Sequence, residues 1–109
     1  MWWPGAAYVT WVGIDGYFYN GSATWAGVFG PAIRQVRGFT AAPVLISETA
    51  VAPSPERPAQ IAALYAGARA GRLAGVVWFD QDQDDPPYHD AWSLLGDPAA
   101  VAAYRKAAR

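Results

Sequence analysis

The sequence predicts an α/β fold built on a parallel sheet, in which three strands alternate with three helices. Three short runs rich in β-branched and aromatic residues are each followed by a segment of helical periodicity. Strands that are separated by a single helix pair in parallel through right-handed crossovers. Each of the three runs also ends in a carboxylate, and chemistry in such sheets gathers at the carboxyl ends of the strands.

We expect strands over three segments of the chain: Tyr8–Asp15, Val44–Ser47 with Glu48 directly after it, and Gly75–Asp80. The second segment is a continuous apolar run bounded by prolines, which is typical of a strand that is buried on both faces. Because parallel strands end at the same edge of a sheet, Asp15, Glu48 and Asp80 are predicted to share one rim.

The helices are predicted from apolar spacing and from terminal residues. Apolar residues recur at helical spacing over Trp25–Val36 but are interrupted by a proline, so we expect a short turn and then a main helix over Pro31–Gly38. A second helix is expected over Pro58–Gly71, and Asp97 is the predicted N-cap of the last helix. The aromatic segment Gly16–Ser22 is predicted to be a loop.

The composition is that of one small globular domain. The chain has 109 residues, of which 53% are hydrophobic and 16% charged, so some apolar surface is expected to face a neighbour. The net charge of -1, with scattered lysines and arginines, argues against nucleic-acid and anionic-membrane partners. No apolar run is long enough to span a bilayer. The segment Met1–Gly5 lacks the pattern of a signal peptide, so localisation is not predicted from these residues.

No metal ion or other cofactor is expected. The chain has no cysteine, and His89 is its only histidine. The acidic segment Asp80–Asp85 begins like a calcium-binding loop, but Asp85 and Ala91 stand where that motif requires glycine and glutamate. We interpret it as a solvated acidic loop. We interpret His89 as a structural or solvent-facing residue, with ligand contact as the alternative.

Carboxylates beside aromatic side chains are the chemistry of glycoside hydrolysis. One carboxylate attacks the anomeric carbon or activates water, and another protonates the leaving oxygen. Trp78 lies two residues before Asp80 and should point to the same side of its strand. The plainer interpretations are that Glu48 caps a loop or pairs with an arginine and that the aromatic residues fill the core.

Four blocks, Val12–Tyr17, Phe29–Pro31, Pro43–Thr49 and Val77–Asp80, together resemble the C-terminal part of glycoside hydrolase family 26. That family contains β-mannanases and relatives that act on other β-glucans and xylans, and the resemblance extends over nearly the whole chain. It implies that the three strands are the sixth to eighth strands of a (β/α)8 barrel. It further implies a retaining glycosidase that cleaves a β-linked polysaccharide such as β-mannan, with a parent enzyme that acts outside the cytoplasm.

The resemblance also implies roles for individual residues. Glu48 matches the catalytic nucleophile, and Tyr17 matches the tyrosine that hydrogen-bonds it. Trp78 matches a tryptophan that stacks against the sugar beside the scissile bond, with packing in the barrel core as its alternative. Asp15 and Asp80 are predicted to contact substrate because of their expected place on the rim.

The chain is shorter than such a barrel. A (β/α)8 domain needs about 250 residues, and the acid/base glutamate of the family lies on strand four, which has no counterpart here. We therefore expect residues 1–109 to be the C-terminal portion of a catalytic domain that hydrolyses nothing at a useful rate without its N-terminal part. The alternatives are a non-catalytic carbohydrate-binding fragment and a structural half-barrel that assembles with a partner chain.

Overall fold

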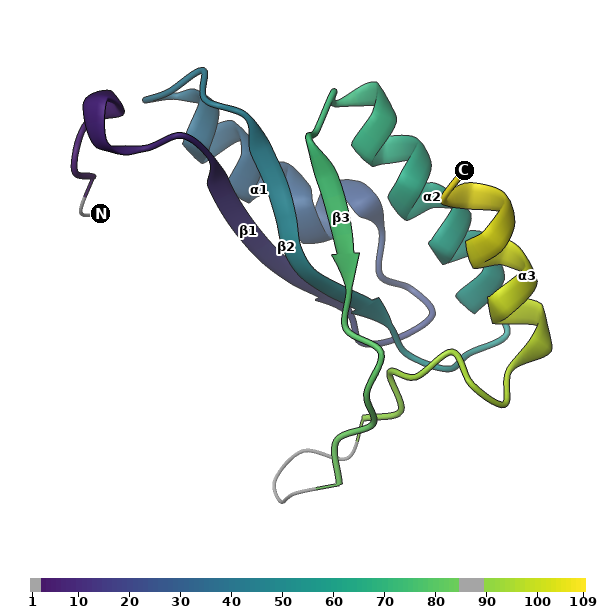
Figure 1. Ribbon diagram of the computed structural model, residues 1–109. Helices are drawn as coiled ribbons and strands as arrows, with labels where there is room; N and C mark the ends of the chain where they lie inside the picture. The colour runs from purple at the N-terminus through teal and green to yellow at the C-terminus, as the bar shows by residue number, and fades with distance from the viewer. Residues whose placement is uncertain (1–2, 85–89) are drawn as a thin grey trace.

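Three parallel strands form one open sheet whose order follows the chain. The computed structural model describes residues 3–84 and 90–109. Strands β1 (Val12–Phe18), β2 (Val44–Val51) and β3 (Gly75–Trp78) lie side by side in the order β1-β2-β3 (Figure 1). Both strand pairs are parallel, which confirms the predicted α/β class and the βαβαβ order.

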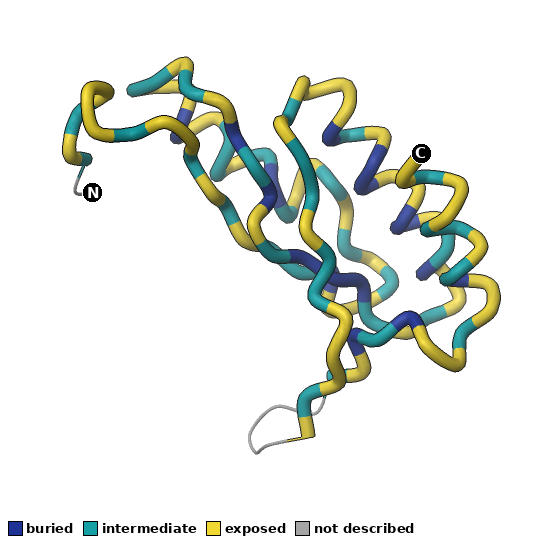
Figure 2. Tube along the Cα trace, in the orientation of Figure 1, coloured by how far each residue is buried: buried dark blue, intermediate teal, exposed yellow. Residues whose placement is uncertain are grey.

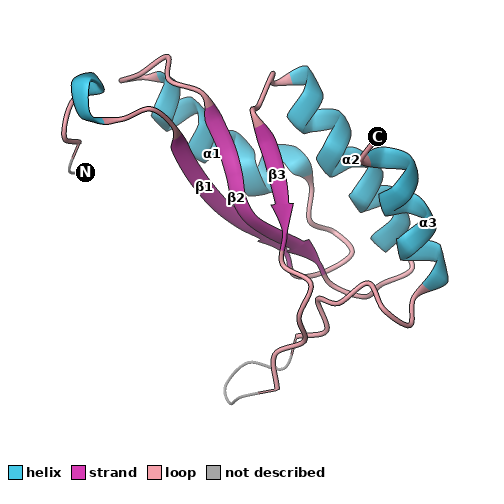
Figure 3. Cartoon of the chain, in the orientation of Figure 1, coloured by secondary structure: helices cyan, strands magenta, loops and turns pink. Residues whose placement is uncertain are grey.

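Each strand is followed by one helix. Helix α1 (Trp25–Arg37) follows β1, α2 (Arg57–Ala70) follows β2, and α3 (Pro98–Ala107) follows β3 (Figure 3). A short 3-10 helix, η1 (Ala6–Tyr8), precedes β1. Helices α1 and α2 pack against the sheet, whereas α3 packs mainly against α2.

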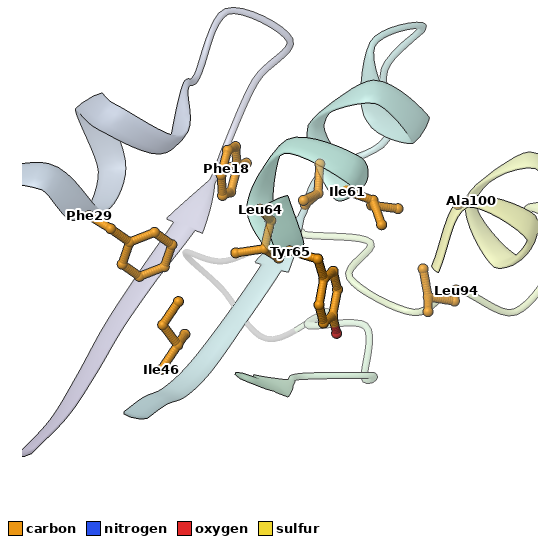
Figure 4. Packing of buried hydrophobic residues seen from close by; sticks show 9 residues of the cluster. Phe18, Phe29, Ile46, Ile61, Leu64, Tyr65, Leu94 and Ala100 are labelled. Carbon is orange, nitrogen blue, oxygen red and sulfur yellow. The ribbon is translucent and has the colours of Figure 1, made fainter. Parts of the chain in front are cut away.

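The hydrophobic core lies between the sheet and the first two helices. Phe18 and Ile46 from the strands, Phe29 from α1 and Leu64 from α2 are fully buried and belong to one cluster (Figure 4). Because one cluster contains side chains of both helices, α1 and α2 must cover the same face of the sheet. Full burial of each such side chain stabilises the fold by about 1.5–3 kcal/mol.

The other face of the sheet carries no helix among the described residues. Along β1, residues with more and with less exposure alternate, as expected for a strand that is covered on one side only (Figure 2). We call this surface the open face; its residues are Gly13, Asp15, Tyr17, Leu45, Ser47, Glu48, Val77 and Phe79. The prediction that the second strand is buried on both faces is therefore wrong for Leu45 and Ser47, although Ala50, which pairs with Tyr17, is fully buried.

The first strand begins and ends later than predicted. It starts at Val12 and continues to Phe18, so Asp15 lies in the middle of β1 and not at its end. Gly16 and the turn residues after it suggested a loop. The strand continues because Phe18 is fully buried against Phe29, at a ring-centroid distance of 6.3 Å.

The other two strand ends also differ from the prediction. Strand β2 extends three residues beyond Glu48, because Thr49, Ala50 and Val51 are fully buried in the sheet. Strand β3 ends at Trp78, two residues before Asp80. Glu48 therefore lies inside its strand, whereas Asp80 lies beyond the end of its own.

The predicted break at Pro31 does not occur. Helix α1 begins at Trp25 and includes Pro31, with Thr24 as its N-cap, whose side chain accepts a hydrogen bond from the Gly27 amide. The indole of Trp25 packs directly on the α2 backbone at Gly67, which leaves no room for a Cβ there. This packing anchors the first turn and offsets the hydrogen bond that the proline removes.

The last helix begins as the sequence predicts. Asp97 is the N-cap of α3, and its Oδ1 accepts a hydrogen bond from the Ala100 amide at 3.0 Å. Pro98 occupies the first helical position, where a missing amide proton removes no hydrogen bond.

Candidate active site

Strand β2 contains a bulge where Glu48 lies. Against β1 the pairing changes from Ile14 opposite Ile46 to Asp15 opposite Glu48, so β2 holds one extra residue. The pairing with β3 shows the same extra residue, because the step from Ile46 to Thr49 on β2 matches a shorter step on β3. A bulge bends its strand and re-aims side chains, and bulges are frequent beside active sites.

The bulge turns two consecutive side chains, Ser47 and Glu48, to the same face. Ser47 Oγ donates to Asp15 Oδ1 at 2.6 Å, and Glu48 Oε1 accepts a short hydrogen bond from the Tyr17 hydroxyl. Asp15 and Tyr17 are two residues apart in β1 and share a face. Regular alternation would have pointed the Glu48 carboxylate into the apolar core, where an unpaired charge is strongly disfavoured.

Tyr17 is the hydrogen-bond partner that the resemblance predicts for Glu48. Both side chains are half-buried. Burial raises the pKa of Tyr17 above its ordinary value, and the hydrogen bond to Glu48 and the nearby charges of Glu48 and Asp15 raise it further. The phenol therefore stays protonated at neutral pH and remains a donor to the carboxylate.

The Ser47 hydroxyl holds the bulge against β1. Besides its bond to Asp15, Ser47 Oγ lies 3.4 Å from the Ile14 carbonyl oxygen. A Cβ on Gly13 would lie 2.8 Å from Ser47 Oγ, so the glycine leaves the space that the serine occupies. Asp15 is exposed and stands opposite Glu48 in the register, which places two carboxylates side by side on the open face.

Trp78 and Asp80 lie away from this group. The Trp78 ring packs against Tyr104 of α3 at a centroid distance of 5.8 Å, and Asp80 Oδ1 accepts a hydrogen bond from the Leu94 amide at 2.7 Å. Both residues line one hollow with Leu94 and Tyr104. The expected common rim of three carboxylates is therefore not formed, because Asp15 and Glu48 lie inside their strands, whereas Asp80 lies beyond the end of β3 and binds the Leu94 amide.

The structure thus unites Asp15, Tyr17 and Glu48 and separates Trp78 and Asp80 from them. For Trp78 the observed packing is that of a core residue. Its role in stacking on a sugar stays a prediction.

Sequence reasoning missed two residues near the site, Trp92 and Arg57. The Trp92 ring is 1% exposed and lies 4.8 Å from the Tyr17 ring between centroids. Arg57, 2% exposed, binds the backbone next to that tryptophan. Trp92 lies in a segment without periodicity, and an arginine between prolines is usually a surface residue, so neither carried a signal.

Aspartates after β3 hold the chain that returns toward α3. Asp82 Oδ1 accepts a hydrogen bond from the Ser93 amide at 2.9 Å, which parallels the contact of Asp80 with the next residue. This part of the predicted acidic loop therefore binds backbone, although Asp82 is also exposed to solvent. Asp85 and His89, which entered the metal argument, lie outside the described residues.

Within residues 3–84 and 90–109, no three histidine, cysteine, aspartate or glutamate side chains come together as metal ligands. None of the helices in this part of the chain is long and apolar enough to cross a bilayer. The chemistry that the described site offers is therefore that of a carboxylate pair and a phenol.

No protein-family profile matches the chain, and no curated protein is significantly similar to it. What the fold and the site define is an α/β protein with an open parallel sheet. A carboxylate–tyrosine pair stands on the face of that sheet opposite the helices.

Proposed function

We propose that this chain forms the last three βα units of a (β/α)8 barrel in a retaining glycosidase related to glycoside hydrolase family 26. The observation that carries the proposal is the hydrogen bond from Tyr17 to Glu48 at the β2 bulge. A carboxylate that is oriented by a hydrogen bond from a phenol is suited to attack an anomeric carbon. The proposed substrate is a β-linked polysaccharide such as β-mannan, and the complete parent enzyme is expected to act outside the cell.

The arrangement of the layers supports a barrel wall. The strand order β1-β2-β3 follows the chain, and the helices after β1 and β2 cover one face only. Doubly wound sheets reverse their order and carry helices on both faces, whereas a (β/α)8 barrel carries them outside only. In the proposed enzyme the open face lines the barrel interior, and the outer edges of β1 and β3 pair with further strands.

The overall dimensions also support an incomplete domain. The molecule is only 21 Å thick along its shortest axis, with a radius of gyration of 14.7 Å. A compact domain of about 100 residues has a radius of gyration of about 13 Å.

In the proposed reaction Glu48 attacks the anomeric carbon and forms a covalent glycosyl-enzyme. Tyr17 holds one carboxylate oxygen, Oε1, and thereby orients the side chain for attack. The leaving oxygen takes its proton from a second carboxyl group about 5–5.5 Å away, which belongs to a strand outside this chain. Asp15, exposed next to Glu48, is the proposed contact for sugar hydroxyls. Trp78, which is partly exposed and lines the hollow beside Asp80, is the proposed stacking residue.

A completed barrel with a covalent trap tests the assignment. The first five βα units of a family 26 β-mannanase are fused to this chain, and the chimera is treated with an activated 2-deoxy-2-fluoro-mannoside. Peptide mapping is expected to find the sugar on Glu48. Glu48→Gln should abolish labelling, and the matched control Glu56→Gln, which changes the only other glutamate that this chain contributes to the chimera, should retain it. A chimera that is folded by circular dichroism and is labelled elsewhere would contradict the assignment.

A second candidate function is carbohydrate binding without hydrolysis. Two aromatic rings favour it, because Trp11 is 54% and Tyr19 63% exposed. Exposed aromatic rings are suited to the apolar faces of sugars. An NMR titration of the chain with mannohexaose distinguishes the candidates. Shifts confined to Trp11 and Tyr19 would favour simple binding, and shifts centred on Asp15 and Glu48 would favour the hydrolase.

A further inference from the structure

We infer that Arg57 and Trp92 are positioning residues that hold Tyr17, and through it Glu48, in the geometry of the site. The inference rests on the proposed function for the role of Glu48. Its test, however, measures the local geometry of this chain and requires no hydrolysis.

The first step is the burial of Arg57 at the start of α2. Its guanidinium donates from Nη2 to the carbonyl oxygens of Trp92 and Ser93, each at 3.1 Å. Nη1 forms an ion pair with Asp97 Oδ2, also at 3.1 Å. A buried guanidinium is tolerated only when it is paired and hydrogen-bonded, and its planar fork fixes the groups that it binds. Arg57 therefore fixes the backbone at residues 92 and 93 against the first turn of α2.

The second step is the immobilisation of Trp92 at both its backbone and its ring. Its carbonyl oxygen accepts a second hydrogen bond from Trp78 Nε1 at 3.3 Å. Its own Nε1 donates to Gln83 Oε1 at 3.1 Å, and the side chain is 1% exposed. With its carbonyl and its indole nitrogen both bound, the ring has one orientation available.

The third step is the contact of Trp92 with the site. The Trp92 and Tyr17 rings meet at a centroid distance of 4.8 Å with an interplanar angle of 45°. Tyr19 packs edge-on against the same indole at 5.5 Å, which supports it from a second side. Trp92 is thus a rigid wall for the phenol ring whose hydroxyl binds Glu48. The contacts run from α2 through the segment after β3 to β1 and then to β2.

A purely structural role for Arg57 and Trp92 makes a different prediction. In that case their loss lowers the stability of the fold but leaves the Tyr17 hydroxyl as it was in every molecule that remains folded. The exchange rate of that hydroxyl proton with water separates the two roles. It reports the hydrogen bond to Glu48 and the burial of the phenol directly.

The experiment uses NMR on the full chain with labelled tyrosine, and the Tyr17 resonances are assigned through Tyr17→Phe. Trp92→Leu keeps an apolar side chain but removes the indole that packs against Tyr17. Arg57→Met removes the guanidinium that binds the backbone at residues 92 and 93. We expect each to accelerate exchange of the Tyr17 hydroxyl by roughly two- to tenfold, the factor that corresponds to the net contribution of one hydrogen bond. Trp92→Phe, which restores an aromatic wall, should bring the rate back toward that of the unmodified chain.

The matched control is Val36→Ala at the far end of α1. Val36 is 8% exposed, so its truncation lowers stability without contact to Tyr17. It should leave the exchange rate unchanged. If Trp92→Leu does not fold, the milder pair Trp92→Phe and Arg57→Lys is compared, and Arg57→Lys should still accelerate exchange because it loses the fork.

An unchanged rate in the folded variants would overturn the inference, as would an equal acceleration in Val36→Ala. The outcome is independent of the fluorosugar trap. Faster exchange in these variants together with a label found elsewhere would refute the hydrolase proposal and leave the positioning of Tyr17 intact.

Discussion

The two faces of the sheet use the same three strands in opposite ways. On the helix-covered face Phe18 and Ile46 close a dry core with the helices. On the open face Asp15 and Glu48 lie beside one another, and each accepts a hydrogen bond from a hydroxyl, of Ser47 and of Tyr17 respectively. Val77 on the same face is 49% exposed. The covered face therefore supplies most of the stability of this chain, whereas the open face holds its carboxylates and the phenol of Tyr17. The bulge in β2 makes this difference between the faces possible, because it places the Glu48 side chain on the open face and not in the core.

The largest expected effect tests this division of stability. Phe29→Ala removes a fully buried ring from the covered face and should lower the free energy of unfolding by about 3–5 kcal/mol. Val77→Ala on the open face should lower it by less than about 1 kcal/mol, because half of the side chain is already in water. Urea titrations of both variants measure the difference. Equal losses would show that the open face is also packed in solution.

A smaller loss of stability is expected when the ion pair between Asp97 and Arg57 is removed. Asn is as good an N-cap as Asp, so Asp97→Asn isolates the ion pair with Arg57 from the helix cap. Because Asp97 is 34% exposed, we expect a loss of about 1–2 kcal/mol. Thermal denaturation at neutral pH measures this loss.

The same residue predicts how stability depends on pH. Hydrogen bonding from the Ala100 amide, helped by Arg57, lowers the pKa of Asp97 below its ordinary value in the folded state. The contribution to stability is therefore present above the pKa of the unfolded chain and is lost as the pH falls through the lower, folded value. Acid denaturation of Asp97→Asn should lack this component. A curve parallel to that of the unmodified chain would contradict the assignment.

The smallest single loss, that of Ser47→Ala, sharpens the account of the bulge. Ser47→Ala removes the bond to Asp15 and should cost about 0.5–1.5 kcal/mol. Gly13→Ala should cost about 1–3 kcal/mol, because its Cβ collides with Ser47 Oγ. The loss of unfolding free energy in the double variant should be smaller than the sum of the two single losses, because Ser47→Ala removes the hydroxyl with which the new Cβ collides. Strict additivity in urea unfolding would mean that these two positions do not meet.

Much of the fold follows from the sequence, because strand and helix periodicities are local. The three βα units, the N-cap at Asp97 and the pairing of Tyr17 with Glu48 are all predicted, the last through resemblance alone. The strand ends are not, since Phe18 and Val51 extend their strands through tertiary burial that no local pattern reveals. The same holds for Pro31, which a distant contact of Trp25 keeps inside a helix.

The site was harder to predict than the fold for a specific reason. Strict alternation places Ser47 and Glu48 on opposite faces, and only the bulge brings them together. A bulge depends on the register of both neighbouring strands, which the sequence of one strand does not contain. Trp92 and Arg57 reach the site through a segment without regular structure, where spacing carries no information.

The most direct test of the central claim asks whether the open face becomes catalytic when it is completed. Reducing-sugar release from mannan, mixed-linkage glucan and xylan is measured for the chain alone and for the chain mixed with the first five βα units of a family 26 enzyme. We predict no release by the chain alone, because general acid catalysis contributes about 10²–10⁴-fold and its donor is missing. Release should appear in the mixture and vanish with Glu48→Ala. Robust release by the chain alone, or release in the mixture that survives Glu48→Ala, would contradict the account.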